Sequence, residues 1–176
     1  MKLKITLLTI LVAVALVACD GNNSNKESSP EETQKIKELV HDYSVGNIEG
    51  SSASITSQQL IVTNSDESKS AYTLPDEEFF VSIAPYINET HPCTNHSLTG
   101  CQGEMVNEEF DVYIEDIKGN VILEETLKSQ SNGFFDLWLP RDKTYRITIT
   151  HGEKKVQSEF STFENDGTCI TNMQLT

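Results

Sequence analysis

Apolar residues recur at two different spacings along this chain, and each spacing predicts a different secondary structure. Near the N-terminal end of the polar part, four apolar residues follow one another at intervals of three or four: Ile36, Leu39, Val40 and Tyr43. This interval places side chains on one face of an α-helix. Two glutamates stand where the first turn would be, and Gly46 stands after the last. We therefore predict a short amphipathic helix over residues 31–45.

Beyond residue 58 the apolar positions form short runs or alternate with polar ones, which is typical of β-strands. Phe110, Val112 and Ile114, for example, alternate with polar or aromatic neighbours. The predicted strands cover residues 60–62, 70–74, 79–84, 110–115, 121–123, 134–139, 145–150, 156–160 and 169–175. Pro85 is expected to end the third of them. No helix alternates with these strands, so a parallel sheet is not expected.

The predicted fold class is therefore mainly β: an antiparallel β-sandwich or barrel with a short N-terminal amphipathic helix. Residues 46–57 are rich in glycine and serine and are predicted to link the helix to the strands. We accordingly predict a helical region and linker at residues 31–57 and a β-rich domain at residues 58–176.

The first residues of the chain have the pattern of an export signal. Two lysines precede a segment that is apolar from Ile5 to Ala18 apart from two threonines. It is shorter than the ~20 residues that span a bilayer, and it fits the core of a secretion signal. The segment ends in Leu16-Val17-Ala18-Cys19, which resembles the bacterial lipobox. We predict a lipoprotein signal peptide at residues 1–18 and lipidation of Cys19; an ordinary signal peptide is the alternative.

The residues that follow are polar, and the chain as a whole is strongly acidic. Residues 19–30 contain little that could be buried, so we predict a flexible tether there. The formal net charge is −14. Such a chain repels phosphate, and nucleic acid is not expected as a partner. Its acidic surface attracts cations and also keeps the protein soluble.

Most of the candidate chemistry lies in one segment, residues 91–105, which interrupts the strand pattern. It contains Cys93, His96 and Cys101, together with His91, Glu104 and Met105. Met105 is expected in the core and Glu104 as a solvated carboxylate. Cys169 lies far away in sequence, but residues distant in sequence often meet at one end of a sandwich.

Three interpretations of these cysteines remain open from the residues alone. Cys93 and Cys101 could form a disulfide, as is frequent in exported proteins, and leave Cys169 free. The three thiolates could instead hold Cu(I), a soft cation. With His96 as a fourth ligand, the same set has the composition of a tetrahedral zinc site.

Four blocks of sequence resemble the CueP family of extracytoplasmic copper-binding proteins. They are residues 79–86, residues 91–104, residues 133–141 and Thr168-Cys169-Ile170-Thr171. The resemblance covers roughly residues 55–175. It implies that residues 58–176 are a copper-binding domain in which Cys93, Cys101 and Cys169 are the metal ligands. His96, three residues after Cys93, is a candidate fourth ligand, a hydrogen-bond partner of a ligand, or a loop residue without a role at the metal.

The resemblance implies a copper-resistance protein that sequesters or buffers Cu(I) and reduces Cu(II). No catalytic residue is assigned, because thiol-based reduction is stoichiometric unless a partner restores the thiols. Candidate partners are the membrane through the lipid anchor, a thiol–disulfide reductase, a copper exporter and a second copy in a dimer. The expected location is the membrane surface outside the cytoplasm, as on a Gram-positive cell. The alternatives are a disulfide-containing cell-surface interaction domain and a zinc-binding chaperone.

Overall fold

The computed structural model describes residues 29–176, which contain one helix and eleven strands. The elements are α1 (Pro30–Ser44), β1 (Ser52–Ile55), β2 (Gln59–Thr63), β3 (Lys69–Thr73), β4 (Glu78–Tyr86), β5 (His96–Ser97), β6 (Glu109–Asp116), β7 (Val121–Lys128), β8 (Phe135–Pro140), β9 (Thr144–His151), β10 (Lys154–Ser161) and β11 (Cys169–Gln174). Among the described residues, no helix is both long enough and apolar enough to cross a membrane. The predicted signal peptide, Cys19 and nearly all of the predicted tether lie outside this range.

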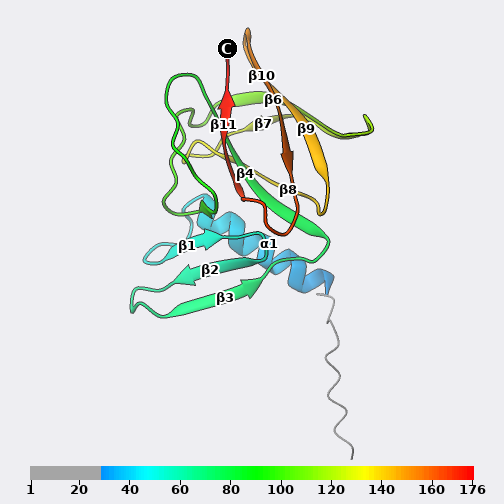
Figure 1. The fold of residues 1–176 in the computed structure, drawn as a ribbon. Helices are drawn as coiled ribbons and strands as arrows, with labels where there is room; N and C mark the ends of the chain where they lie inside the picture. Colours follow the sequence, from blue (N-terminus) through cyan, green and yellow to red (C-terminus); the bar gives the residue numbers. More distant parts are fainter. Residues whose placement is uncertain (1–28) are drawn as a thin grey trace, which may run out of the picture.

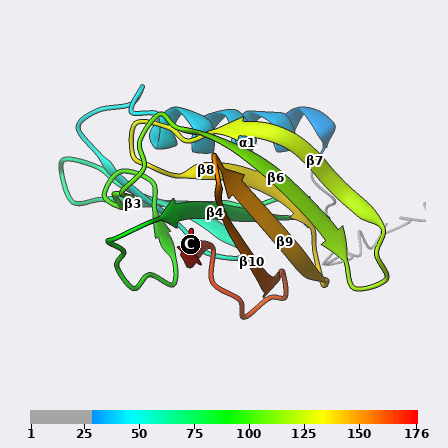
Figure 2. The ribbon, with the colours of Figure 1, turned by 90° about the horizontal axis from the view of Figure 1, so that it is seen from above.

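The strands form three sheets. One sheet has the order β10-β9-β6-β7, a second the order β11-β4-β8, and a third the order β3-β2-β1-β5. The first two sheets make the larger body, and α1 and the strands β1–β3 lie together at one end of this body (Figures 1 and 2). The fold is thus mainly β and sandwich-like rather than a closed barrel, which confirms the predicted class.

Helix α1 begins at Pro30 after a local cap. The Ser29 hydroxyl accepts a hydrogen bond from the Glu32 N–H, which satisfies one of the donors left free at a helix start. Val40 and Tyr43 from the predicted apolar stripe are buried against the small sheet. A lone helix of this length would be marginal in water, so this packing stabilises it.

Strand β4 lies at the centre of the molecule because both of its faces are buried. Phe79, Val81 and Ile83 point toward the β10-β9-β6-β7 sheet and join the main core. On the opposite face, Phe80 packs with α1 and the small sheet, and Ala84 packs beside Cys169. A strand covered on both sides reads as a continuous apolar run, as residues 79–84 do.

Three local predictions were wrong, and each has a structural reason. Residues 46–57 are not all linker: β1 forms there because it pairs with β2 and β5 and because Ala53 and Ile55 are buried in the same apolar cluster as α1. Pro85 does not end β4, since pairing with β8 already stops at Ile83 and needs no N–H from residue 85. The middle sheet is mixed: β11 runs parallel to β4, which the long connection between them allows.

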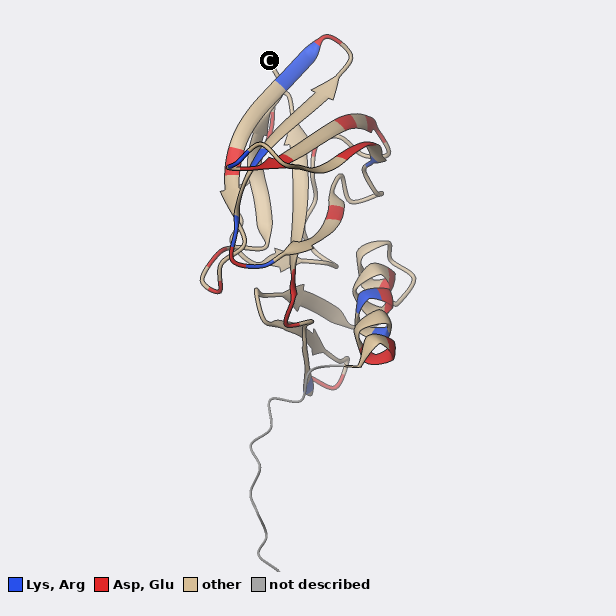
Figure 3. Cartoon of the chain, turned by 90° about the vertical axis from the view of Figure 1, so that its right-hand side faces the viewer, with Lys and Arg blue, Asp and Glu red and all other residues tan. Residues whose placement is uncertain are grey.

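Acidic side chains are spread over both ends of the molecule. Figure 3 shows them on α1, on strands and on several loops, with lysines interspersed on the helix. Some acidic residues are paired across the β10-β9-β6-β7 sheet: Arg146 contacts Glu115 at 2.5 Å and Glu159 at 3.5 Å. The net negative charge therefore belongs to the whole surface rather than to one patch.

Candidate metal centre

The candidate centre lies where the connection between β4 and β6 crosses the end of β11. This connection spans residues 87–108 and contains the two-residue strand β5. It supplies Cys93 and Cys101, which are partly exposed, and His96, which is fully buried. Cys169, the first residue of β11, is buried beneath them. The three cysteines are free thiols in this structure.

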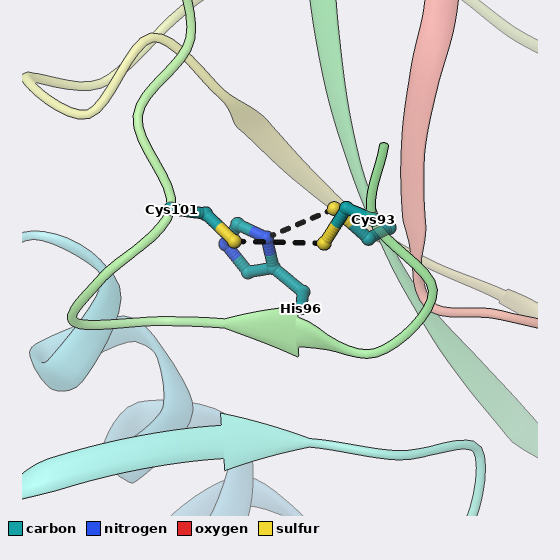
Figure 4. A group of neighbouring side chains, drawn as sticks. Cys93, His96 and Cys101 are labelled. Carbon is teal, nitrogen blue, oxygen red and sulfur yellow. Dashed lines mark hydrogen bonds between the residues drawn. The ribbon is translucent and has the colours of Figure 1, made fainter. Parts of the chain in front are cut away.

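The four side chains face one another closely. The sulfur atoms of Cys93, Cys101 and Cys169 and a ring nitrogen of His96 all lie within 4.8 Å of one another. Cys93 Sγ is 3.5 Å from Cys101 Sγ, and Cys169 Sγ is 3.5 Å from His96 Nδ1 (Figure 4). The structure thus brings together every side chain that the sequence named as a ligand or candidate ligand.

Cys169 reaches the loop because of how β11 is attached. Its N–H donates to the Thr94 carbonyl at 3.1 Å, directly after Cys93 in the chain. Gly167 allows this approach, since a Cβ at that position would come within 2.7 Å of the Thr94 oxygen. On its other side Cys169 is in register with Ser82 of β4. Two neighbours therefore fix the position of the buried sulfur.

His96 is fixed by a different pair of contacts. In β5 it pairs with Ile55 of β1, and its N–H donates to the Thr168 hydroxyl at 2.9 Å. That hydroxyl donates in turn to the Ile55 carbonyl at 2.6 Å. The ring packs on Phe134, with 4.5 Å between ring centroids. Within the described residues, His96 Nε2 is buried without a hydrogen-bond partner.

Burial dominates the electrostatics of the centre. It raises the pKa of the Cys169 thiol strongly and that of Cys93 to a lesser extent. It lowers the pKa of His96 to about 4, although the carboxylate of Asp136 acts in the opposite direction. The imidazole is therefore neutral at physiological pH and has a lone pair available for a metal ion.

The donor set fits a soft or borderline metal ion. Thiolates and a neutral imidazole bind Cu(I) and Zn²⁺ in preference to hard cations. Ligand atoms about 2.3 Å from a central ion in a tetrahedron lie roughly 3.8 Å apart. The two distances of 3.5 Å between donor atoms are close to that separation, so small side-chain shifts suffice to enclose an ion.

Three other residues of the loop have different surroundings. His91 stacks edge-on against Phe134, with centroids 6.3 Å apart, and is not among the four grouped donors. Met105 is buried in the main core. Glu104 is exposed but not merely solvated: its carboxylate accepts hydrogen bonds from the N–H groups of residues 87–89.

Two features of the centre were missed at the level of the sequence. Thr168 belongs to one of the resembling blocks, but nothing in the sequence indicates that its hydroxyl joins β1 to β5. The close approach of Gly103 to Gly133 was also missed; a Cβ on Gly103 would lie 2.7 Å from the Gly133 oxygen. The one sequence signal for this close approach is a glycine, Gly103, two residues after Cys101.

Comparison with known proteins gives a consistent result. A family model described as "Periplasmic copper-binding protein CueP" matches residues 35–174. A solved crystal structure of S.CueP is similar to this chain with 34% identity and a TM-score of 0.76, covering 85% of this chain and 99% of that one. No match was found among curated proteins. The family match extends over almost all of the described residues, and the chain belongs to the CueP family of periplasmic copper-binding proteins.

Proposed function

We propose that this protein binds Cu(I) outside the cytoplasm through the thiolates of Cys93, Cys101 and Cys169 and thereby buffers copper in copper resistance. The observation that supports this most directly is the grouping of three sulfurs within 4.8 Å. Soft thiolates favour a soft monovalent ion. His96, with a neutral ring at the same distance, is the candidate fourth ligand.

Binding by this site is coupled to proton release. A metal ion needs thiolates, so each thiol loses its proton when the ion enters. Because burial raises the pKa of Cys169 and Cys93, these thiols are protonated in the metal-free protein at neutral pH. The Cu(I) affinity should therefore rise with pH.

The same thiols supply a route for reducing Cu(II). When two thiolates form one disulfide they release two electrons, which reduce two Cu(II) ions to Cu(I). One thiol then remains, so the three-thiolate site is lost until a thiol–disulfide reductase restores it. The Cys93 and Cys101 sulfurs lie 3.5 Å apart and are a pair that could form this disulfide. Such reduction is stoichiometric rather than catalytic.

The location of this activity follows from the N-terminal sequence. The lipobox-like segment ending at Cys19 supports attachment to the outer face of a membrane by lipid, with residues 20–28 as part of the tether. In a cell with a single membrane, such an anchor would retain the protein at the surface. Signal-peptide cleavage and lipidation can be read directly by mass spectrometry of the N-terminal peptide.

Substitution of the buried ligand tests the copper proposal. Fully reduced Cys169→Ser protein should bind Cu(I) at least 10-fold more weakly than the wild type in competition with a chromophoric Cu(I) chelator. Met105→Leu is the matched control, because it removes a nearby buried sulfur that is not among the four donors. An unchanged Cu(I) affinity in Cys169→Ser would refute the three-thiolate site.

Zinc binding is the second candidate function, and the position of His96 favours it. Three thiolates and one imidazole form a common tetrahedral zinc site. X-ray absorption on protein loaded with each metal separates the two candidates. A nitrogen ligand with Zn²⁺, lost in His96→Gln, together with tighter Zn²⁺ than Cu(I) binding, would favour the zinc function.

A further inference from the structure

We propose that Glu104 is a positioning residue that clamps together the two arms of the metal-binding loop and so sets the distance between Cys93 and Cys101. This inference rests on the proposed function of the thiols. The clamp joins the base of the arm that leads to Cys93 with the base of the arm that follows Cys101. It lies outside the group of four donors, so it acts on the metal only through the loop.

The contacts of the Glu104 carboxylate are numerous for an exposed side chain. Its Oε2 accepts hydrogen bonds from the N–H groups of Ile87 at 2.6 Å, Asn88 at 2.9 Å and Glu89 at 3.4 Å. Its Oε1 accepts from the Asn88 side-chain amide at 2.8 Å. These bonds, with the Asn88 N–H as the largest contributor, hold the pKa of Glu104 at about 2. The carboxylate is thus a charged acceptor throughout the neutral range.

These contacts join the two arms of the loop that carry Cys93 and Cys101. Ile87–Glu89 lie a few residues before Cys93, and Glu104 lies three residues after Cys101. Each arm is otherwise attached to a different neighbour. The Cys93 arm is bonded to β11 through Thr90, whose hydroxyl donates to the Thr171 carbonyl, whereas the Gly103 N–H of the other arm donates to the Asn132 carbonyl. The carboxylate ties the two attachments to each other.

A clamp of this kind lowers the entropy that metal binding must remove. Without the carboxylate, each arm would be held only by its own neighbours and the two thiols would sample more separations, while thiols on clamped arms stay near the binding geometry. Partners that hydrogen-bond directly to metal ligands typically change metal affinity by about 10- to 100-fold, and Glu104 acts on the ligands only through the loop. Since Glu104 is exposed to solvent, we expect an effect at the lower end of that range.

The test compares Glu104→Gln with Glu89→Gln. Both variants remove one negative charge from the same loop, but no hydrogen bond is made by the Glu89 side chain within the described residues. Glu104→Gln, by contrast, keeps one neutral oxygen for the backbone N–H groups but loses the charge that strengthens these bonds, and its NH₂ group replaces the oxygen that accepts from the Asn88 side chain. Chelator competition on reduced full-length protein should show about 10-fold weaker Cu(I) binding in Glu104→Gln. Glu89→Gln should stay within about twofold of the wild type.

A second measurement separates positioning from folding and from copper chemistry. In a Cys169→Ser background, the Cys93–Cys101 disulfide is equilibrated with oxidised and reduced glutathione at temperatures where circular dichroism shows folded protein. Glu104→Gln should lower the equilibrium constant for disulfide formation severalfold, and Asn88→Ala, which removes one of the bonds, should lower it less. This readout does not require copper, so it tests the clamp even if the wild-type protein fails to bind Cu(I).

The outcomes are distinct. If Glu104→Gln and Glu89→Gln give the same disulfide equilibrium in folded protein, the clamp does not position the thiols and the proposal is wrong. If the disulfide equilibrium shifts but wild-type Cu(I) binding is absent, the clamp stands and the proposed function fails. A lower melting temperature with an unchanged equilibrium would make Glu104 a structural residue only.

Discussion

At the scale of single residues, His96 links the metal site to the stability of the fold. Its ring is fully buried between aromatic side chains, and its backbone is bonded to Thr168. A charged imidazole in this environment would lose its hydration without gaining a partner for Nε2. The same burial that keeps the ring neutral for a metal therefore makes the metal-free fold sensitive to acid.

Acid should destabilise the metal-free protein through this residue. The pKa of His96 is about 4 in the folded protein against an ordinary value of 6.5, so the unfolded chain binds more protons between these pH values. The stabilisation is complete above pH 6.5 and is lost as the pH falls toward 4. From pH 7 to pH 4.5 we expect a loss of about 2 kcal/mol in the free energy of unfolding from this group.

Urea unfolding of reduced protein with a chelator present, at both pH values, provides the measurement. His96→Gln should lose about 2 kcal/mol less than the wild type over this range, since the titration of carboxylates is common to both proteins. His41→Gln, at an exposed position on α1, controls for the removal of one histidine. Equal pH dependence in the wild type and in His96→Gln would contradict the expectation.

The candidate ligands were recognisable from the sequence, whereas the hydrogen bonds of the residues around them were not. Cysteine and histidine are uncommon enough that Cys93, His96 and Cys101 within one loop are a signal in themselves. Thr168 and Glu104 are ordinary polar residues, and their importance depends on which backbone groups they meet in space. The residue types that can bind a metal ion are visible in a sequence, but the hydrogen bonds around them depend on the folded structure.

At the scale of elements, the centre stands at the junction of two sheets. β5 brings His96 from the small sheet, and β11 brings Cys169 from the middle sheet. The Thr168 hydroxyl connects them, since it accepts from His96 N–H and donates to the Ile55 carbonyl. The Thr168 hydroxyl is therefore one of the contacts that set the relative position of the imidazole and the thiol.

Removal of that hydroxyl should weaken the junction. Thr168→Val keeps the volume but leaves the His96 N–H and the Ile55 carbonyl each without a buried partner, at a cost of about 1–3 kcal/mol per group. We expect a loss of roughly 2–3 kcal/mol in the free energy of unfolding by urea titration. Thr171→Val, on β11 and without a side-chain hydrogen bond in the described structure, should change it by less than about 0.5 kcal/mol.

The loop after Cys101 is fixed to the β7–β8 connection by close backbone packing. A Cβ on Gly103 would lie 2.7 Å from the Gly133 oxygen and 3.2 Å from the Ala84 Cβ. Gly103→Ala should therefore cost about 2 kcal/mol of stability through overpacking and move Cys101 away from the other donors. Urea unfolding and Cu(I) competition measure the two effects.

A glycine in the same loop provides the control for this prediction. A Cβ on Gly100 would approach the Ser97 hydroxyl at 2.8 Å, but this oxygen can rotate away. Gly100→Ala should leave the stability within about 0.5 kcal/mol and the Cu(I) affinity unchanged. If both alanine variants behave alike, the Gly103–Gly133 contact does not hold the loop in place.

Elements with strong periodicity were predicted well, and elements defined by their neighbours were not. The stripe on α1 and the alternation in β6 are local patterns, so they were visible in the sequence. β1 contains two serines and an alanine and becomes a strand because β2 and β5 flank it. The parallel pairing of β11 with β4 likewise depends on the whole topology, which no local pattern records.

At the scale of the whole molecule, a bound metal ion would join parts that are distant in sequence and belong to different sheets. The four candidate donors come from the loop between β4 and β6, from β5 in the small sheet and from β11 in the middle sheet. These parts meet correctly only in the folded protein, so an ion held by all of them stabilises the folded state over the unfolded chain. Metal binding and folding should therefore be linked quantitatively.

Thermal unfolding of reduced protein measures this linkage. With free Cu(I) buffered at about 1,000 times its dissociation constant, the fold gains about 4 kcal/mol. For a chain of this size that gain corresponds to a rise in Tm of roughly 10 °C, lessened by any binding of copper to unfolded thiols. Met105→Leu should show the same rise from its own starting value. In Cys169→Ser the connection to β11 is missing, so the rise should fall to a few degrees, about the gain expected for an ion held within the loop. Equal rises in the wild type and in Cys169→Ser would mean that the ion is held by the loop without β11.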